Sequence, residues 1–134
     1  EVVKVISDAI KQAREMARAA LEQTYEGRCT IIEYHDVMEE KTKLSHEKEV
    51  IVLEDKPCKL SFEKIDAAVQ TETAALVSQN IKLFIAPEIR VNSGSKIIVT
   101  QNGITEEYSA SGKPAIYFTH QKILMVQTFY SQVL

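Results

Sequence analysis

The chain of 134 residues contains little of several residue types that mark specialised protein classes. It has four glycines, three prolines and no tryptophan, which argues against a collagenous, disordered or low-complexity protein. Its two cysteines, Cys29 and Cys58, are far too few for a small secreted disulfide scaffold. Two buried free thiols are the favoured interpretation, and one disulfide is the alternative. No apolar run approaches the ~18–20 residues that a membrane-spanning helix needs.

The charge balance disfavours a protein that grips nucleic acid. Sixteen Lys and Arg residues against 19 Asp and Glu residues give a net charge of −3, whereas a generic nucleic-acid-binding domain is basic. The length predicts a single domain over residues 1–134, because domains commonly contain ~100–200 residues. A chain of this size can sustain an ordinary hydrophobic core.

The N-terminal segment is helical in pattern. Residues 2–25 have helical periodicity, and region 1–27 is predicted to be a helix that Gly27 ends. One apolar stripe runs along it, formed by Val2, Val3, Ile6, Ala9, Ile10, Ala13, Met16, Ala17, Ala20 and Leu21. Because alanine dominates this apolar stripe, its partner must approach closely. That partner is either the rest of the chain's own domain or a neighbouring subunit.

Strand patterns occupy most of region 28–134. They cover residues 30–37, 49–53, 57–62, 81–85, 96–101, 104–109, 115–119 and 123–130. The strand at 81–85 continues briefly at 89–91, and a helix is the alternative for 123–130. Asn102-Gly103 predicts a tight hairpin, since both turn positions need a positive φ, and residues 111–114 predict a further turn. The pattern predicts a mainly β fold: a small antiparallel β-barrel or sandwich of six to eight strands with an N-terminal α-helix.

Two connections between the predicted strands are unusual. Residues 38–48 are crowded with Glu, Lys and His, and they predict a solvated hairpin loop, with charged extensions of both strands as an alternative. Residues 63–79 form a long connection, and long connections are usually functional or disordered. Its side chains are small, and its charges sum to −2, from Glu63, Lys64, Asp66 and Glu72.

No arrangement of residues predicts catalysis or metal binding. His35, His46 and His120 lie on different predicted elements and lack the spacing of metal ligands. Nothing around Cys29 or Cys58 suggests an activated thiol. We therefore expect no catalytic residues, no metal site and no cofactor, and we do not expect an enzyme.

The C-terminal half carries a run of motifs that resembles a known family. The run is Ile89-x-Val91-x-x-Gly94-Ser95-Lys96-Ile97-x-Val99, followed by Asn102-Gly103, Tyr108, Gly112 and Pro114. Upstream, a "Pro-Cys-x-Leu-Ser-Phe" strand at 57–62 leads into the long connection. Together, residues 29–126 resemble small head-completion proteins of tailed phages, the head–tail adaptor or head-closure (stopper) proteins of phages and prophages of Gram-positive bacteria.

Two features depart from that family. Ser95-Lys96 stands where the family usually has an acidic residue after the glycine, and helix 2–25 is an addition to the minimal barrel. The stopper itself, a neighbouring connector ring and a tail-terminator protein therefore stay open as alternatives. A small β-barrel module for protein interaction is the alternative from another class.

The resemblance implies a structural subunit of a phage head–tail connector. Such subunits assemble into a homo-oligomeric ring, expected to be twelvefold, that continues the DNA channel below the portal, retains packaged DNA and docks the tail. The implied partners are a portal or adaptor protein above and a tail terminator or tail tube proteins below. Double-stranded DNA passes through without sequence-specific binding, and no membrane is involved. The implied location is the virion neck, after synthesis in the host cytoplasm.

The resemblance also implies roles for particular residues. The connection 63–79 projects into the lumen and gates it through Glu63, Lys64, Asp66, Gln70, Thr71, Glu72 and Thr73. Its charge of −2, repeated around a ring, repels phosphates and lets DNA slide. A surface loop without a gating role is the alternative. Contacts to neighbouring subunits, portal or tail are expected from Ile6, Ile10, Met16, Glu39, Glu40, Lys41 and Lys43.

Overall fold

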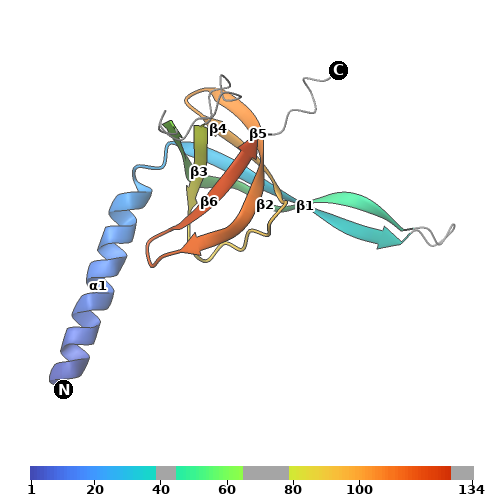
Figure 1. Ribbon diagram of the computed structural model, residues 1–134. Helices are drawn as coiled ribbons and strands as arrows, with labels where there is room; N and C mark the ends of the chain where they lie inside the picture. Colours follow the sequence, from blue (N-terminus) through green and yellow to red (C-terminus); the bar gives the residue numbers. More distant parts are fainter. Residues whose placement is uncertain (39–44, 65–78, 128–134) are drawn as a thin grey trace.

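An antiparallel barrel of six strands follows one N-terminal helix in the computed structural model, which describes residues 1–38, 45–64 and 79–127 (Figure 1). The elements are α1 (Val2–Glu22), β1 (Gly27–Met38), β2 (Ser45–Lys64), β3 (Gln79–Ile85), β4 (Lys96–Gln101), β5 (Ile104–Ile116) and β6 (Gln121–Gln127). Around the closed barrel the strands follow the order β1-β2-β3-β6-β5-β4. The predicted mainly β fold with an N-terminal helix is confirmed, and its sheet forms a barrel.

The barrel interior is built from side chains that alternate along each strand with outward-facing ones. In β4, Ile97 and Val99 are fully buried, and the residues between and beside them are not. Burying one such side chain contributes roughly 1.5–3 kcal/mol, so the alternation of β-branched residues is sufficient reason for the strands to close. The other fully buried large aliphatic side chains are Ile31, Leu83, Ile85 and Ile123.

The two cysteines lie in this interior as free thiols. The interpretation of Cys29 and Cys58 as buried free thiols is therefore confirmed. The neighbouring Cys29 thiol, followed by burial, raises the pKa of Cys58. Because the thiolate is the nucleophilic form, the Cys58 side chain behaves as a small hydrophobic group.

The hairpin predicted at Asn102-Gly103 is present between β4 and β5. Asn102 has φ 54° and Gly103 has φ 77°, which are the left-handed angles that this two-residue turn requires. The strands on either side pair from Gln101 opposite Ile104 to Lys96 opposite Ser109. The turn therefore sets the register of the whole hairpin.

The predicted role of Gly27 as the end of the helix is wrong. α1 ends at Glu22, and Gln23 after it has right-handed helical angles (φ −67°, ψ −20°). Gly27 instead begins β1, where an added Cβ would lie 3.1 Å from the Cys58 carbonyl oxygen and 3.1 Å from Gln101 Oε1. The close approach of β1 to its neighbours is the reason for glycine at this position.

The predicted strands 49–53 and 57–62 are parts of one strand, β2. Asp55 has φ 53°, and the register between β1 and β2 shifts between Cys29 and Ile31, so the long strand contains an irregularity where two strands were expected. Met38 and Ser45 pair at the far end of this ladder. The charged extensions of both strands are therefore present.

After β3, the structure differs from three of the predicted strand and turn assignments. The predicted turn 111–114 is a bulge inside β5, where Gly112 has φ 70° and the register against β6 shifts. The strand predicted at 115–119 is wrong beyond Ile116, because the Tyr117 N–H donates to the His120 carbonyl (2.8 Å) and closes a turn. The continuation at 89–91 is a loop that carries the buried Val91. Residues 128–130 of the predicted last strand lie outside the described part.

Candidate assembly surfaces

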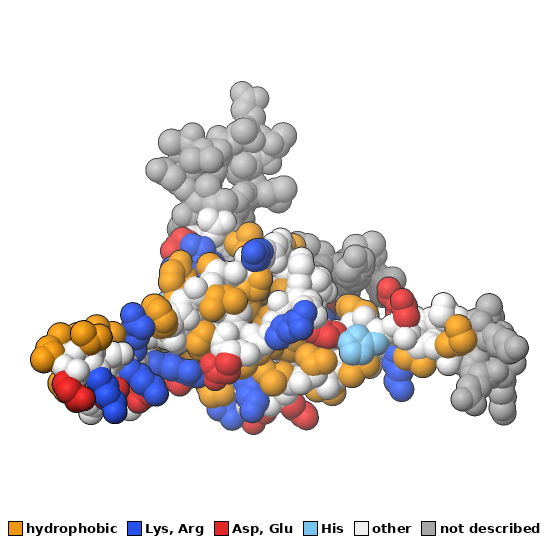
Figure 2. Space-filling model, turned by 90° about the horizontal axis from the view of Figure 1, so that it is seen from below, with side chains coloured by type: hydrophobic (Ala, Val, Ile, Leu, Met, Phe, Trp, Pro, Cys, Tyr) orange, Lys and Arg blue, Asp and Glu red, His pale blue; other side chains and the backbone are white. Residues whose placement is uncertain are grey.

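α1 projects away from the barrel and exposes its apolar stripe (Figure 1). Val3, Ile6 and Ile10 are 81%, 55% and 47% exposed, and no residue of the helix is buried. Figure 2 shows hydrophobic side chains gathered on the outer surface at this end of the molecule, on its left. Most helical stability in proteins comes from packing of such a stripe, so this surface is one that a further molecule can cover.

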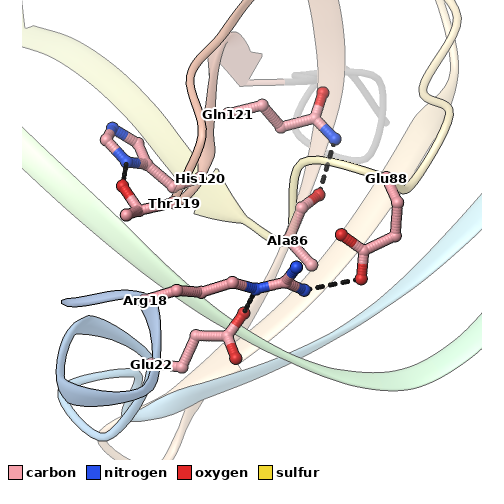
Figure 3. Close-up of polar contacts among 7 residues, drawn as sticks. All are labelled: Arg18, Glu22, Ala86, Glu88, Thr119, His120 and Gln121. Atoms are coloured by element: carbon pink, nitrogen blue, oxygen red, sulfur yellow. Dashed lines mark hydrogen bonds and ion pairs between the residues drawn. The ribbon is translucent and has the colours of Figure 1, made fainter. Parts of the chain in front are cut away.

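The side of the helix next to the apolar stripe contacts the barrel. Arg18 Nε donates to Glu22 Oε2 (3.0 Å), and Arg18 Nη2 donates to Glu88 Oε1 (2.6 Å) (Figure 3). The hydrogen bond from Arg18 lowers the pKa of the Glu88 carboxyl. One turn earlier, the Arg14 guanidinium lies 3.7 Å from the ring centroid of Phe118. Arginines, not the apolar stripe, therefore join α1 to the barrel.

The loop that receives Arg18 is held by a buried amide. Gln121 is 1% exposed, and its Nε2 donates to the carbonyl oxygens of Ala86 (2.8 Å) and Ile89. Figure 3 shows the Gln121 amide bound to Ala86 and Arg18 bound to Glu88, and Ala86 and Glu88 belong to the same loop. The position of Glu88, and through it the direction of α1, thus depends on a residue of β6.

Lys4, Lys11 and Arg18 lie on the polar side of α1, which also carries Asp8 and Glu15, whereas Arg14 lies next to the apolar stripe. Residues seven positions apart on a helix differ by only ~20° in direction, so Lys4, Lys11 and Arg18 lie in one line. A groove of about 690 Å³ runs between the helix and Phe118. It is lined by members of the apolar stripe together with Lys11, Arg14, Glu15 and Arg18. Within the described residues, Lys4 and Lys11 form no ion pair.

On the side of the barrel away from the helix, the distal parts of β1 and β2 form a two-stranded projection, which we call the arm (Figure 1). It comprises residues 33–38 of β1 and 45–50 of β2, paired from Glu33 opposite Val50 to Met38 opposite Ser45. In the described residues these segments pair only with each other, because β4 ends its pairing with β1 at Ile32 and β3 pairs with β2 from Lys59 onward. An isolated two-stranded ribbon is only marginally stable in water.

One face of the arm combines apolar and acidic side chains. Side chains alternate along a strand, so this face carries Tyr34, Asp36 and Met38 of β1. The Tyr34 side chain is 47% exposed and the Met38 side chain is 67% exposed. Glu47 lies directly opposite Asp36 in the ladder. Like charges directly opposite each other destabilise a strand pair, and neither carboxylate has an ion-pair partner among the described residues.

The structure places part of the predicted contact and gating residues. Ile6, Ile10 and Met16 lie on the exposed apolar stripe. Glu63 and Lys64 belong to β2; Glu63 Oε2 lies 3.7 Å from Lys82 Nζ, and Lys64 pairs with Gln79 of β3. The remaining predicted residues lie outside the described part of the chain: Glu39, Glu40, Lys41, Lys43, Asp66, Gln70, Thr71, Glu72 and Thr73.

Sequence reasoning missed the residues that hold the helix and those that charge the arm. Arg18 and Glu88 are 70 positions apart, so no local pattern could have joined them. The sequence could have predicted the opposition of Asp36 and Glu47. Asp36 lies just before the charged connection 38–48 and Glu47 lies near its end, and the alternative of extended strands places them across from each other.

The described residues show no centre for metal chemistry and no helix suited to span a membrane. No group of three or more His, Cys, Asp or Glu side chains is arranged to hold an ion there. None of the helices in that part of the chain has the length and apolar character that a bilayer crossing needs.

No protein-family model and no curated protein matches the chain. Among solved structures, the chain is similar to the xkdH protein of the phage-like element PBSX from Bacillus subtilis. The TM-score is 0.44 and the sequence identity is 14%, over 80% of this chain and 95% of that chain.

Proposed function

We propose that the chain is a structural subunit of a phage head–tail connector ring, a head-closure or adaptor protein that works by assembly and not by catalysis. The observation that carries the proposal is a closed barrel with two projecting elements, α1 and the arm, whose large apolar side chains are exposed. Exposed apolar surface bordered by charge is typical of protein–protein contacts. The motif run from Ile89 to Pro114 supports the same assignment, because it resembles head-completion proteins.

The proposed ring surrounds DNA below the portal and docks the tail on its other side. The described ends of the connection 63–79 lie next to each other, since Lys64 and Gln79 pair directly across β2 and β3. In this proposal the connection is the gate that retains packaged DNA. The net charge of −3 suits a channel wall that DNA must slide past, because acidic surfaces repel phosphates.

Assembly is tested by light scattering on size-exclusion fractions of the full chain, alone and mixed with purified portal or tail. The proposal predicts a ring alone or a stable complex with one of these partners. Connector subunits can be monomeric until they dock, so both measurements are needed. A stable monomer that joins neither partner contradicts the proposal and favours a small protein-interaction module.

Gating is tested separately by deleting residues Gln70–Ala75. We expect rings to form normally and packaged DNA in filled heads to become accessible to nuclease. Ala74→Ser, which keeps the length of the connection and changes none of the predicted gating residues, is the matched control and is expected to retain DNA. Unchanged DNA retention in the deletion variant contradicts the gate and leaves the ring assignment intact.

A further inference from the structure

We propose that the arm of one copy of this chain docks on a basic outer face of the barrel of the next copy. The inference rests on the proposed function only in requiring that copies of the chain assemble. It assigns one interface within that assembly and names the surface that each copy contributes.

The receiving surface lies on the outside of β2, β3 and β6. In β3 the buried side chains alternate with Lys82 and Phe84, which therefore point outward. Phe84 lies directly opposite Lys59 of β2 on one side and Lys122 of β6 on the other. Leu124 of β6 lies opposite Lys82 and adds an exposed apolar side chain. We call this set of residues the basic face.

The basic face carries positive charge that its own side chains do not neutralise. Lys82 Nζ lies 3.7 Å from Glu63 Oε2, which forms one long ion pair at the border of the face. Within the described residues, neither Lys59 nor Lys122 has a carboxylate partner, and Lys122 Nζ lies 5.7 Å from the Phe84 ring centroid. Three lysines and one glutamate give this surface a charge of +2 in a chain whose net charge is −3, so an acidic partner is the one that it attracts.

The arm carries the complementary charge. Asp36 and Glu47 lie directly opposite each other, and neither carboxylate has an ion-pair partner among the described residues. Lysines brought to this pair would offset the repulsion between the two carboxylates. The neighbouring Glu49 already accepts a hydrogen bond from Lys96 Nζ at 3.0 Å, so the contact uses Asp36 and Glu47.

Both surfaces also place apolar side chains beside their charges. Tyr34 and Met38 flank Asp36 on the arm, and Phe84 and Leu124 lie among the lysines of the basic face. Exposed apolar surface bordered by charge is typical of a contact between proteins. The phosphate backbone that dominates nucleic-acid binding has no apolar groups to cover Leu124, so a protein segment fits this face better.

The two sets of charges match in spacing. Lys59 and Lys122 lie on either side of β3, two strand spacings apart, which is about 10 Å. Asp36 and Glu47 are directly opposite on neighbouring strands, so their Cβ atoms are about 5 Å apart. Both carboxylates of the arm therefore fit between the two lysines, above Phe84.

The contact must join different copies. One strand, β2, contributes Glu47 to the arm and Lys59 to the basic face. These residues are twelve positions apart on an extended strand, which is a distance of up to about 40 Å. Figure 1 shows the arm projecting away from the barrel, so it does not reach the basic face of its own copy. A contact between two different surfaces is heterologous, and repetition of it generates a ring when the rotation closes.

The experiment is a charge swap on the full chain. The arm reversal is Asp36→Lys with Glu47→Lys, and the face reversal is Lys59→Glu with Lys122→Glu. The arm reversal keeps two like charges opposite each other, so the ladder retains its internal repulsion. Two charge-matched controls change exposed sites outside both surfaces: Glu26→Lys with Glu54→Lys for the arm, and Lys4→Glu with Arg90→Glu for the face.

Sedimentation over a concentration series gives the dissociation constant of self-association. Each reversal alone is expected to raise this constant at least about tenfold, because two attractive contacts become repulsive, and the controls are expected to leave it unchanged. Raising the salt concentration is expected to weaken wild-type assembly, because the Debye length falls from about 8 Å at 0.15 M to about 3 Å at 1 M.

Mixing the two reversed chains separates a lost contact from a folding defect. In the mixture each reversed arm meets a reversed face, and each original arm meets an original face, so both contacts are attractive again. An equal mixture is therefore expected to recover most of the lost assembly. Two misfolded chains do not recover on mixing, so recovery identifies a contact between copies.

Each other outcome overturns the inference in a recognisable way. A wild-type oligomer that is insensitive to both reversals, or a mixture that fails to recover, rules out the contact between arm and basic face while the ring proposal stands. A wild-type chain that stays monomeric at all concentrations rules out the contact as a driver of assembly, and docking to purified portal then decides the proposed function. Binding of duplex DNA that the face reversal abolishes, without self-association, assigns the basic face to nucleic acid instead.

Discussion

The buried amide of Gln121 gives a direct test of how the helix is positioned. Gln121→Met removes both hydrogen bonds and changes the side-chain volume little. The Ala86 carbonyl also accepts the Ile89 N–H at 3.3 Å, so it keeps one partner. The Ile89 carbonyl loses the Gln121 donor. A lost hydrogen bond costs about 1 kcal/mol, and a buried group left without a partner costs about 1–3 kcal/mol. We therefore expect the free energy of unfolding to fall by about 2–4 kcal/mol.

Urea unfolding followed by circular dichroism measures this change. The midpoint is expected to fall while the slope of the transition stays constant, because the folded and unfolded surfaces are unchanged. Gln127→Met is the matched control on the same strand. Gln127 donates one bond to Glu106 Oε2 at 3.1 Å from a half-exposed position, so its loss is expected to cost less than about 1 kcal/mol. If Gln121→Met differs from wild type by less than about 0.5 kcal/mol, the amide does not hold this loop and the argument fails.

Two further predictions concern the barrel and its surface. Gly27→Ala is expected to destabilise the chain by about 1 kcal/mol in the same unfolding assay. The new Cβ would lie only 3.1 Å from the Cys58 carbonyl oxygen and 3.1 Å from Gln101 Oε1. A gain in stability would refute the close approach of β1 to these neighbours. Burial, and then Lys122, lower the pKa of His120, so the folded chain resists its protonation. The unfolded chain then binds more protons below about pH 6.5, and stability is expected to fall as pH decreases through this range. His120→Gln should flatten that pH profile, and an unchanged profile would show that His120 does not cause it.

The sequence pattern was sufficient for the elements that depend on local chemistry. Asn102-Gly103 predicted its hairpin because only a few residues accept two positive φ angles in succession. The alternation in 96–101 predicted which side chains face the core, and the buried Ile97 and Val99 agree with it. Such features involve neighbours in the chain, so periodicity and turn chemistry reach them.

The features that needed the structure depend on distant residues. Gly27 was expected to end a helix, but its role is set by Cys58 and Gln101, which meet it only in the folded barrel. Gly112 resembled the centre of a turn, yet β5 continues through it as a bulge because β6 resumes its pairing at Ala115. A glycine marks an unusual backbone, and the sequence does not reveal whether a turn, a bulge or a close contact is the cause.

The helix shows a different limit of the same reasoning. Amphipathic patterns usually indicate the face that packs on the rest of the chain. Here Arg14 and Arg18 supply the ion pair and the cation–π contact with the barrel, and no residue of the apolar stripe is buried. The periodicity predicted that a helix forms and which face needs a partner. It could not identify the partner, because both a chain's own core and a neighbouring subunit satisfy the same pattern.

α1 is attached to the barrel at Arg18, so a small rotation about this point moves its N-terminal end. Sixteen residues separate Arg18 from Val2, so the N-terminal end of the helix lies about 24 Å from the point of attachment. A rotation of about 10° at the Arg18–Glu88 contact moves the N-terminal end of the helix by about 4 Å, which is close to the distance between neighbouring strands. The strands of the barrel need not move during this rotation. In the proposed ring, subunits of this shape can therefore meet neighbours at slightly different separations while each barrel keeps the same internal packing.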